Sequence, residues 1–174
     1  MAELSSANPE RARIQTDVLV NGKHVDAMLD TGAPTSIISQ SAAKGAGVDP
    51  GQDGTKFAGK VTGVAGKPID AWIGTFGAFA LGDESVRKVK LRIADLFAAD
   101  TRQTLGSHIA QPVEGLPEML VGADFFRSHR ILVLFKERKL VFTYNGGPIF
   151  QVIESDAAPQ GGPAVRRNGF TLWK

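Results

Sequence analysis

Apolar and polar residues alternate along much of the first half of the chain, which is the pattern of half-buried β-strands. The alternation is clearest over residues 13–20, and Asn21-Gly22 follows as a two-residue turn that favours positive φ. Residues 23–29 alternate again, and Asp30 comes directly after them. The pattern predicts a β-hairpin whose second strand delivers Asp30 at its end.

Further runs predict an antiparallel β series in the middle of the chain. They cover residues 57–61, 69–76, 78–81 and 86–93, with a glycine-punctuated turn between the first two. In the last run Lys88, Lys90 and Arg92 alternate with apolar residues. We therefore expect these three cations to coat a solvated strand face.

Two short helices are expected among the strands. Residues 36–46 are rich in Ala, Ile and Ser and stop at Gly47, which is typical of a helix with a glycine cap. Residues 125–129 form the second candidate, with Asp124 near its N-cap. The chain is thus predicted to be all-β with one or two short helices.

The second half of the chain ends in a further strand and a hairpin. Residues 118–121 are predicted to form an apolar strand, and residues 131–135 and 140–144 to pair with each other. Residues 97–117 lack a clean period and are expected to form a long surface loop.

A length of 174 residues fits one domain. We expect a flexible N-terminal segment over residues 1–12, the folded domain over residues 13–145 and a Gly/Pro-rich tail over residues 146–174. No apolar stretch approaches the length of a membrane span, so the domain is expected to be soluble without direct membrane contact. A location in a bacterial periplasm or cell envelope is expected only if an upstream anchor or signal was removed.

Charge and composition exclude several classes of function. Lys and Arg outnumber Asp and Glu by 20 − 18 = 2, so the chain has no concentrated basic footprint and nucleic acid is not an expected partner. The sequence contains no cysteine, which excludes disulfides and thiolate chemistry. None of the Gly-Lys pairs is followed by Ser or Thr, and the three histidines are scattered, so neither a phosphate loop nor a metal site is predicted.

The strongest chemical signal is an apolar strand that feeds Asp30-Thr31-Gly32-Ala33, with Ser36 three positions later. Such a carboxylate leaves its strand into a tight turn. Glycine lets backbone N–H groups approach the carboxylate, and hydroxyl groups can orient it. The bare Asp-Thr-Gly tripeptide also fits an ordinary turn after a strand, so its meaning depends on the rest of the chain.

This motif resembles the active-site motif of aspartic proteases, and the likeness to the retropepsin family extends over residues 15–144. Further segments that resemble the family are Phe57 to Lys67, Met119 to Phe126 and Ile131 to Tyr144. The resemblance implies a single-lobe, retropepsin-like acid protease barrel. Aspartic proteolysis needs two neighbouring carboxylates that share one proton, whereas Asp-Thr-Gly occurs once in this chain. The resemblance therefore also implies a homodimer, in which each subunit supplies one carboxylate.

The resemblance assigns roles to residues by position. It implies that Asp30 is catalytic and that Asp124 is not a catalytic match. The active-site loop would comprise Thr31, Gly32, Ala33 and Ser36. The substrate-binding flap would comprise Gly63, Val64, Ala65 and Gly66, and the residues that support the loop would be Leu120, Val121 and Gly122.

The function that follows from the resemblance is an aspartic endopeptidase that acts on an extended peptide or protein, with neither metal nor cofactor. Two alternatives stay open. The chain could be a catalytically inactive module of the same fold that binds peptides or mediates dimerisation, or a protease restricted to processing its own chain.

Overall fold

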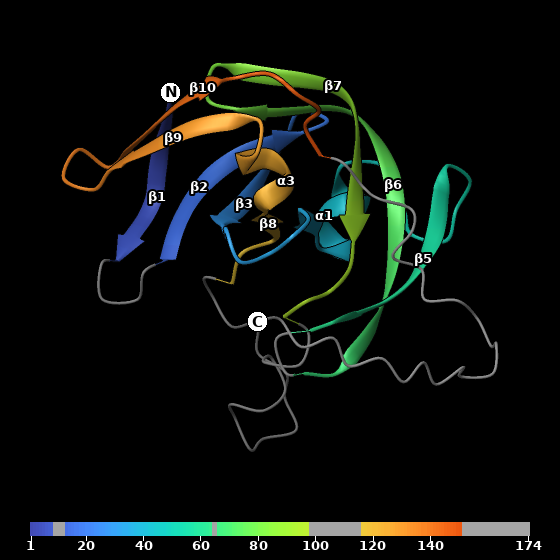
Figure 1. The fold of residues 1–174 in the computed structure, drawn as a ribbon. Helices are drawn as coiled ribbons and strands as arrows, with labels where there is room; N and C mark the ends of the chain where they lie inside the picture. The colour runs from blue at the N-terminus through green and yellow to red at the C-terminus, as the bar shows by residue number, and fades with distance from the viewer. Residues whose placement is uncertain (9–12, 64–65, 98–115, 151–174) are drawn as a thin grey trace, which may run out of the picture.

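The computed structural model describes residues 1–8, 13–63, 66–97 and 116–150, and we confine structural statements to these ranges. Figure 1 shows strongly curved strands and two short helices. The strands are β1 (Ala2–Asn8), β2 (Arg13–Val20), β3 (Lys23–Leu29), β4 (Ile37–Ile38), β5 (Thr55–Thr62), β6 (Pro68–Leu81), β7 (Glu84–Ile93), β8 (Met119–Val121), β9 (His129–Leu134) and β10 (Lys139–Tyr144). The helices are α1 (Gln40–Gly45) and α3 (Ala123–Phe126).

One hydrogen-bonded sheet connects the strands in the order β5-β6-β7-β4-β8-β3-β2-β1-β10-β9. A further pairing between β6 and β2 closes the six strands from β6 to β2 into a barrel. Within it, β3 and β8 run parallel, and Leu29 lies opposite Val121. The predicted all-β class is therefore confirmed, and the parallel pair brings two distant loops together at one end of the barrel.

The predicted hairpin ahead of Asp30 is present with the expected bounds. β2 and β3 pair from Ile14 opposite Leu29 to Val20 opposite Lys23. Asn21 and Gly22 form the turn with φ of 50° and 77°, the left-handed values that this residue pair tolerates. The period-two pattern and the two-residue turn together therefore set the register that carries the chain to Asp30.

The N-terminal residues differ from the flexible segment expected over residues 1–12. β1 pairs with β10 through Ala2 and Glu3 and with β2 from Leu4 onward. Ala2 and Leu4 are buried, and the Thr16 hydroxyl donates to the Glu3 carbonyl at 2.7 Å. This strand was not apparent in the sequence because its partners, β2 and β10, are brought beside it only by the tertiary fold.

The helix predicted over residues 36–46 is shorter than expected. Ile37 and Ile38 instead form β4, which pairs with both β7 and β8. α1 starts at Gln40 after Ser39, whose side chain accepts from the Ala42 N–H. α3, in contrast, begins two residues earlier than predicted, with Gly122 rather than Asp124 at its N-cap.

β6 runs unbroken through Gly77, where a break between two shorter strands was expected. On the neighbouring strand β7, Lys88 has a φ of 55°. Phe76 pairs with Val89 and Ala78 pairs with Arg87, so the register is the same on both sides of Gly77 and Lys88. Lys88 and Lys90 are exposed as predicted, but Arg92 is only 7% exposed. The prediction that Arg92 coats a solvated face was wrong, because Arg92 lines a cavity together with residues of the β5–β6 hairpin and of the loop after Asp30.

Aromatic and aliphatic side chains fill the barrel and its outer edge. Phe76, Phe79 and Phe125 are the largest of the fully buried side chains. Phe150 is buried against Phe79 with ring centroids 4.8 Å apart, so the first residues of the expected tail pack on the core. Residues 151–174 lie outside the described residues.

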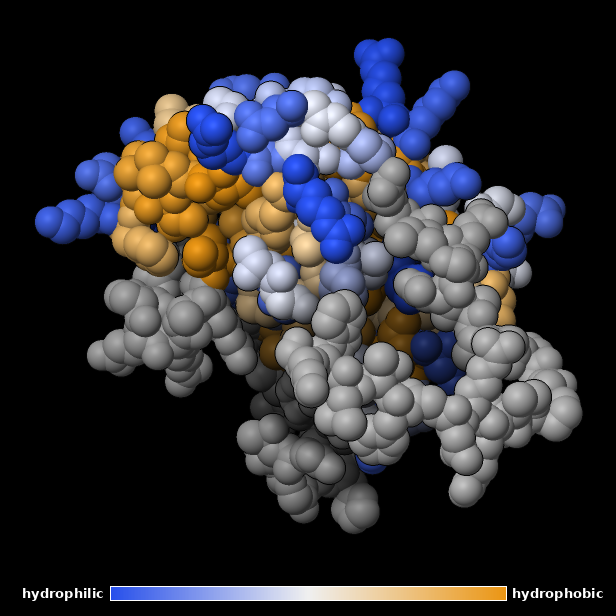
Figure 2. Space-filling view, in the orientation of Figure 1, coloured by the Kyte–Doolittle hydropathy of each residue, from blue (hydrophilic) through white to orange (hydrophobic). Residues whose placement is uncertain are grey.

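Apolar surface gathers at the left of the molecule in Figure 2, over the region where Figure 1 shows β9 and the turn that follows it. Leu132 and Phe135 are 56% and 50% exposed there. β9 lies at the end of the strand order, so this apolar surface adjoins a sheet edge.

Two acidic residues face each other across the first hairpin. Asp26 lies directly opposite Asp17, and its backbone N–H donates to Glu118 at 3.3 Å. The Asp26 Oδ1 atom is buried and has no hydrogen-bond partner among the described residues. Burial raises the pKa of Asp26 above 3.8, and the charges of Glu118 and Asp17 raise it further.

We expect Asp26→Asn to stabilise the protein at neutral pH by about 0.2–1 kcal/mol, the usual size of a like-charge cross-strand repulsion. A raised pKa means that the folded state holds its proton more tightly, so stability falls as pH rises from 3.8 through the folded pKa. The gain should therefore vanish below pH 3.8. Urea unfolding at neutral pH and below pH 3.8 measures this gain, with the exposed Asp53→Asn as control. An equal gain at the two pH values would contradict repulsion of the Asp26 charge as its cause.

Candidate active site

Asp30 lies where β3 leaves the barrel. Its backbone N–H donates to the Val121 carbonyl at 2.9 Å, so the parallel pairing of β3 with β8 holds the residue in place. The Ala33 N–H donates to the Asp30 carbonyl at 3.2 Å and closes a tight turn. The carboxylate is thus carried by a rigid strand end rather than by a free loop.

The turn directs one backbone donor at the Asp30 carboxylate. The Gly32 N–H donates to Oδ1 at 2.8 Å, and a Cβ at Gly32 would lie only 3.1 Å from that oxygen. No partner of Oδ2 is found among the described residues. Thr31 and Gly32 are exposed, so this oxygen and the turn beside it are available to solvent or to another chain.

A buried network fixes the second half of the loop. Asp124 accepts hydrogen bonds from the Ser36 backbone N–H at 2.9 Å and from the Ser36 hydroxyl at 2.6 Å. The same hydroxyl accepts from the Gly122 N–H at 2.9 Å. Ser36 and Asp124 are 1% and 5% exposed, so these hydrogen bonds form where no water competes for them.

Gly122 lies against the backbone of the Asp30 loop. A Cβ at this position would come within 2.7 Å of the Ala33 carbonyl oxygen and 2.8 Å of the Thr35 oxygen. The neighbouring Ala123 N–H donates to the same Ala33 carbonyl at 2.8 Å. The two loops therefore touch backbone to backbone, and only glycine allows that approach.

The predicted flap residues are placed only in part. β5 and β6 form an antiparallel hairpin that reaches Thr62 opposite Pro68. Gly63 and Gly66 close it, with the Gly66 N–H donating to the Gly63 carbonyl at 2.9 Å. Val64 and Ala65, at the expected tip, lie outside the described residues.

A cavity of about 350 Å³ lies between this hairpin and the Asp30 loop. Residues from both elements line it, together with the ends of β7 and β8: Ala33, Pro34, Thr35, Ile37, Val61, Thr62, Gly63, Arg92, Leu96 and Leu120. Its lining is mostly apolar, and its polar side chains are Thr35, Thr62 and Arg92. The described structure thus places a recess for a side chain next to the second half of the loop that begins at Asp30.

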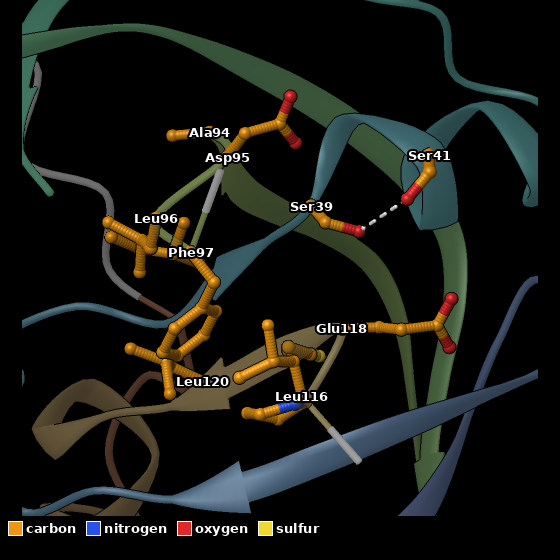
Figure 3. Close-up of a pocket in the computed structure, with 12 residues that line it drawn as sticks. Ser39, Ser41, Ala94, Asp95, Leu96, Phe97, Leu116, Glu118 and Leu120 are labelled. Carbon is orange, nitrogen blue, oxygen red and sulfur yellow. Dashed lines mark hydrogen bonds between the residues drawn. The ribbon is translucent and has the colours of Figure 1, made fainter. Parts of the chain in front are cut away.

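A second cavity, of about 320 Å³, shares Ile37, Leu96 and Leu120 with the first (Figure 3). Its polar groups are Ser39, Ser41, Asp95 and Glu118, and Ser39 and Ser41 bond each other at 3.0 Å. None of the residues from Asp30 to Ser36 lines it. It therefore belongs to the start of α1 rather than to the candidate active site.

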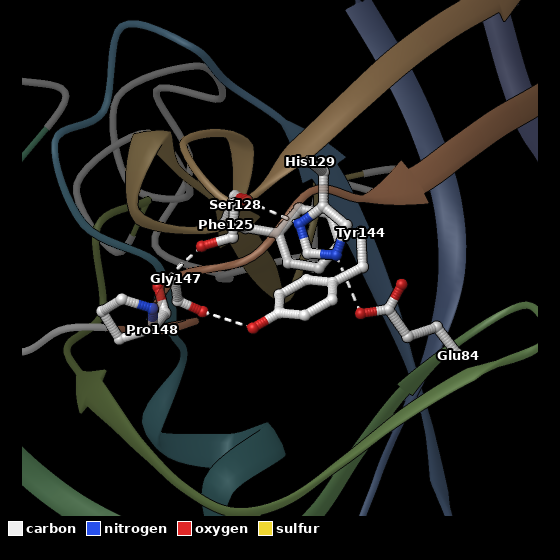
Figure 4. Close-up of polar contacts among 7 residues, drawn as sticks. All are labelled: Glu84, Phe125, Ser128, His129, Tyr144, Gly147 and Pro148. Carbon is white, nitrogen blue, oxygen red and sulfur yellow. Dashed lines mark hydrogen bonds and ion pairs between the residues drawn. The ribbon is translucent and has the colours of Figure 1, made fainter.

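Helix α3, which carries Asp124, is supported from behind by His129 (Figure 4). The His129 ring stacks on Phe125 with centroids 4.0 Å apart, and its Nδ1 contacts the Phe125 carbonyl at 2.8 Å. Its Nε2 contacts Glu84 on β7 at 2.8 Å, and the Ser128 hydroxyl donates to Pro148 at 2.7 Å. Ser128 and His129 are buried, and their contacts tie the end of α3 to β7 and to Pro148.

The loop predictions fall in one place. Thr31, Gly32 and Ala33 form the turn after Asp30. Val121 accepts from the Asp30 N–H, Gly122 donates to the Ser36 hydroxyl, and Leu120 pairs with Met28 and Ile37 on either side of the loop. Sequence reasoning missed the role of Asp124, which was placed at a helix cap. A possible signal was the acidic residue after an apolar-apolar-Gly turn, but only the fold shows that its partner is Ser36, 88 positions earlier.

The described residues contain no group of three or more His, Cys, Asp or Glu side chains that could hold a metal ion. Among them, no helix has the length and apolar character needed to traverse a bilayer.

Residues 16–125 match a family model described as aspartyl protease. Among solved structures, the chain is similar to a retropepsin-like aspartic protease from Rickettsia conorii, with 15% identity and a TM-score of 0.53 over 83% of this chain and 89% of that chain. It also resembles the EIAV protease solved with the inhibitor HBY-793, at 16% identity over 70% and 92% of the two chains with a TM-score of 0.46.

A third structure, the retroviral protease-like domain of Ddi1 from Leishmania major, is 15% identical over 76% of this chain and 87% of that chain with a TM-score of 0.42. No curated protein sequence matches the chain. The Rickettsia structure establishes a shared fold, and the family model covers more than half of the residues.

Proposed function

The chain belongs to the aspartyl protease family and has a retropepsin-like fold, and we propose that it is an aspartic endopeptidase active as a homodimer. The observation that carries the proposal is the position of Asp30. Its carboxylate follows a rigid strand end, its Oδ1 accepts from Gly32, and the turn around it is exposed. The Asp-Thr-Gly motif occurs once in the sequence, so one chain supplies one such carboxylate.

The chemistry requires a second carboxylate close to the first. Two adjacent carboxyls share one proton, because two like charges at that separation cannot both ionise. A twofold axis through the exposed turn would bring Asp30 against the partner subunit's Asp30. The ionised carboxylate then takes a proton from water as the water attacks the peptide carbonyl, and the protonated carboxyl donates to the carbonyl oxygen. The tetrahedral intermediate collapses as the C–N bond breaks, the carboxyl that took the proton gives it to the leaving amine nitrogen, and two peptides are released.

The substrate in this proposal is an extended peptide between the Asp30 loop and the β5–β6 hairpin. Gly63, Val64, Ala65 and Gly66 act as the flap, whose glycines permit opening and closing. The backbone of the peptide pairs with strand edges, and its side chains enter recesses such as the cavity beside Thr35. Thr31 and Gly32 lie at the subunit contact.

The dimer requirement predicts that specific activity depends on protein concentration. A single chain carries one Asp30. As the protein concentration increases, activity per milligram should therefore rise steeply at concentrations below the dimer dissociation constant and level off above it. Cleavage of an unstructured protein by diluted samples, compared with mass from sedimentation velocity, measures both. An activity per chain that stays constant while the protein changes from dimer to monomer would contradict the shared site.

A further inference from the structure

Arg92 occupies an unusual place for a cation. It lies near the end of β7, between Ile73 of β6 and Ile37 of β4, so strands flank it on both sides. It is 7% exposed, although Lys88 and Lys90 on the same strand are exposed. The side chain carries a guanidinium group, and the Nε atom of that group is buried.

The guanidinium group lacks a protein counter-charge in the described part of the chain. Its Nε is buried and has no hydrogen-bond partner there, and none of the ion pairs found among the described residues includes it. Leaving a buried cation unpaired is costly, and a packed apolar side chain would serve stability better. Arg92 is thus poorly explained by folding alone.

Arg92 lines the cavity between the Asp30 loop and the β5–β6 hairpin, and it is the sole charged residue among the described residues that line this cavity. Thr35 and Thr62 add hydroxyl groups, while Leu96 and Leu120 add apolar walls. A water molecule occupies about 30 Å³. The cavity volume of about 350 Å³ therefore accommodates a side chain of the size of aspartate or glutamate.

From this arrangement we infer that the cavity binds an acidic side chain of the peptide substrate and that Arg92 determines this specificity. The inference rests on the proposed peptidase function, because it assigns the cavity to the same substrate that Asp30 would cleave. A carboxylate can take two parallel hydrogen bonds from a guanidinium group. An amide of the same shape would leave the cation uncompensated, and a site built around a charged donor rejects such an analogue.

The proposed twofold dimer repeats the cavity on both sides of the cleft. Because each copy lies beside its own Asp30 loop, the preference should fall at two substrate positions, one on each side of the cut bond. Acidic residues at other positions should have little effect.

The test is a positional series of peptides in which each residue near the cut is Glu, Gln or Leu in turn. We expect wild-type protein to cleave the best Glu peptide at least about tenfold faster in kcat/KM than its Gln counterpart, as hydrogen bonds to charged groups give. Arg92→Met should remove this preference while cleavage of the Leu peptides persists. Arg87→Met is the matched control, because Arg87 lies exposed on the same strand and outside this cavity.

The possible results separate the inference from the peptidase proposal. Cleavage without a Glu preference at any position, or the same preference in Arg92→Met, would overturn the role of Arg92 and leave the peptidase intact. This Glu-to-Gln comparison needs only wild-type protein, so it holds even if a variant does not fold. If no peptide is cleaved, the peptidase proposal fails, and enrichment of Glu over Gln peptides on immobilised wild-type protein decides the role of Arg92.

Discussion

Asp30→Asn is expected to lower peptide cleavage by at least about 10²–10⁴-fold, the usual contribution of a general acid or base. Asparagine has the shape of aspartate and can still accept from the Gly32 N–H through its side-chain oxygen. It cannot hold the negative charge that draws a proton from water. The loss should therefore appear in kcat, with the fold and the dimer mass unchanged.

A fluorogenic peptide assay measures this loss, and sedimentation velocity and thermal unfolding verify the assembly and the fold. Asp53→Asn is the matched control, because Asp53 is exposed and does not line the cavity between the Asp30 loop and the β5–β6 hairpin. Equal activity of the wild-type and Asp30→Asn proteins would reject Asp30 as a catalytic residue.

Mixing the two forms extends this test to the dimer. If each active site needs Asp30 from both subunits, excess Asp30→Asn protein should suppress wild-type activity, because mixed dimers hold one carboxylate. Activity that falls only in proportion to dilution would show that each chain acts alone.

Gly122→Ala is expected to destabilise the protein by about 1–3 kcal/mol or more, as overpacking does. The new Cβ would lie 2.7 Å from the Ala33 oxygen and from the Thr35 carbonyl carbon. These atoms are backbone of the loop that carries Asp30, so they cannot rotate away as a flexible side chain could. The loop must shift, and activity should fall together with the free energy of unfolding.

Gly45→Ala is the control for this prediction. Gly45 is exposed in α1, and a Cβ there would have nothing within 4 Å. Alanine is expected to stabilise that helix by about 0.5–1 kcal/mol, because glycine loses more backbone entropy on folding. Urea unfolding compares the two variants, and a loss in Gly45→Ala equal to that in Gly122→Ala would show that the effect is not caused by loop contact.

Local pattern alone determined the features that depend on neighbours in sequence. The alternation over residues 13–29 and the Asn21-Gly22 turn gave the hairpin with its correct bounds, and the final hairpin was also predicted correctly. Asp30 was identified by its motif, because its turn is formed by residues adjacent to it. The role of Asp30 in catalysis stays a prediction.

The tertiary structure alone decided which distant segments meet. β4 forms at residues predicted to be helical, because β7 and β8 offer it hydrogen-bond partners on both sides. Asp124 is a loop-positioning residue only because α3 packs beside Ser36. Arg92 has the alternating pattern of an exposed strand residue, yet the fold covers it and turns it toward the cavity beside the Asp30 loop. A period of two specifies the face of a strand to which a side chain belongs, whereas the long-range packing specifies what covers that face.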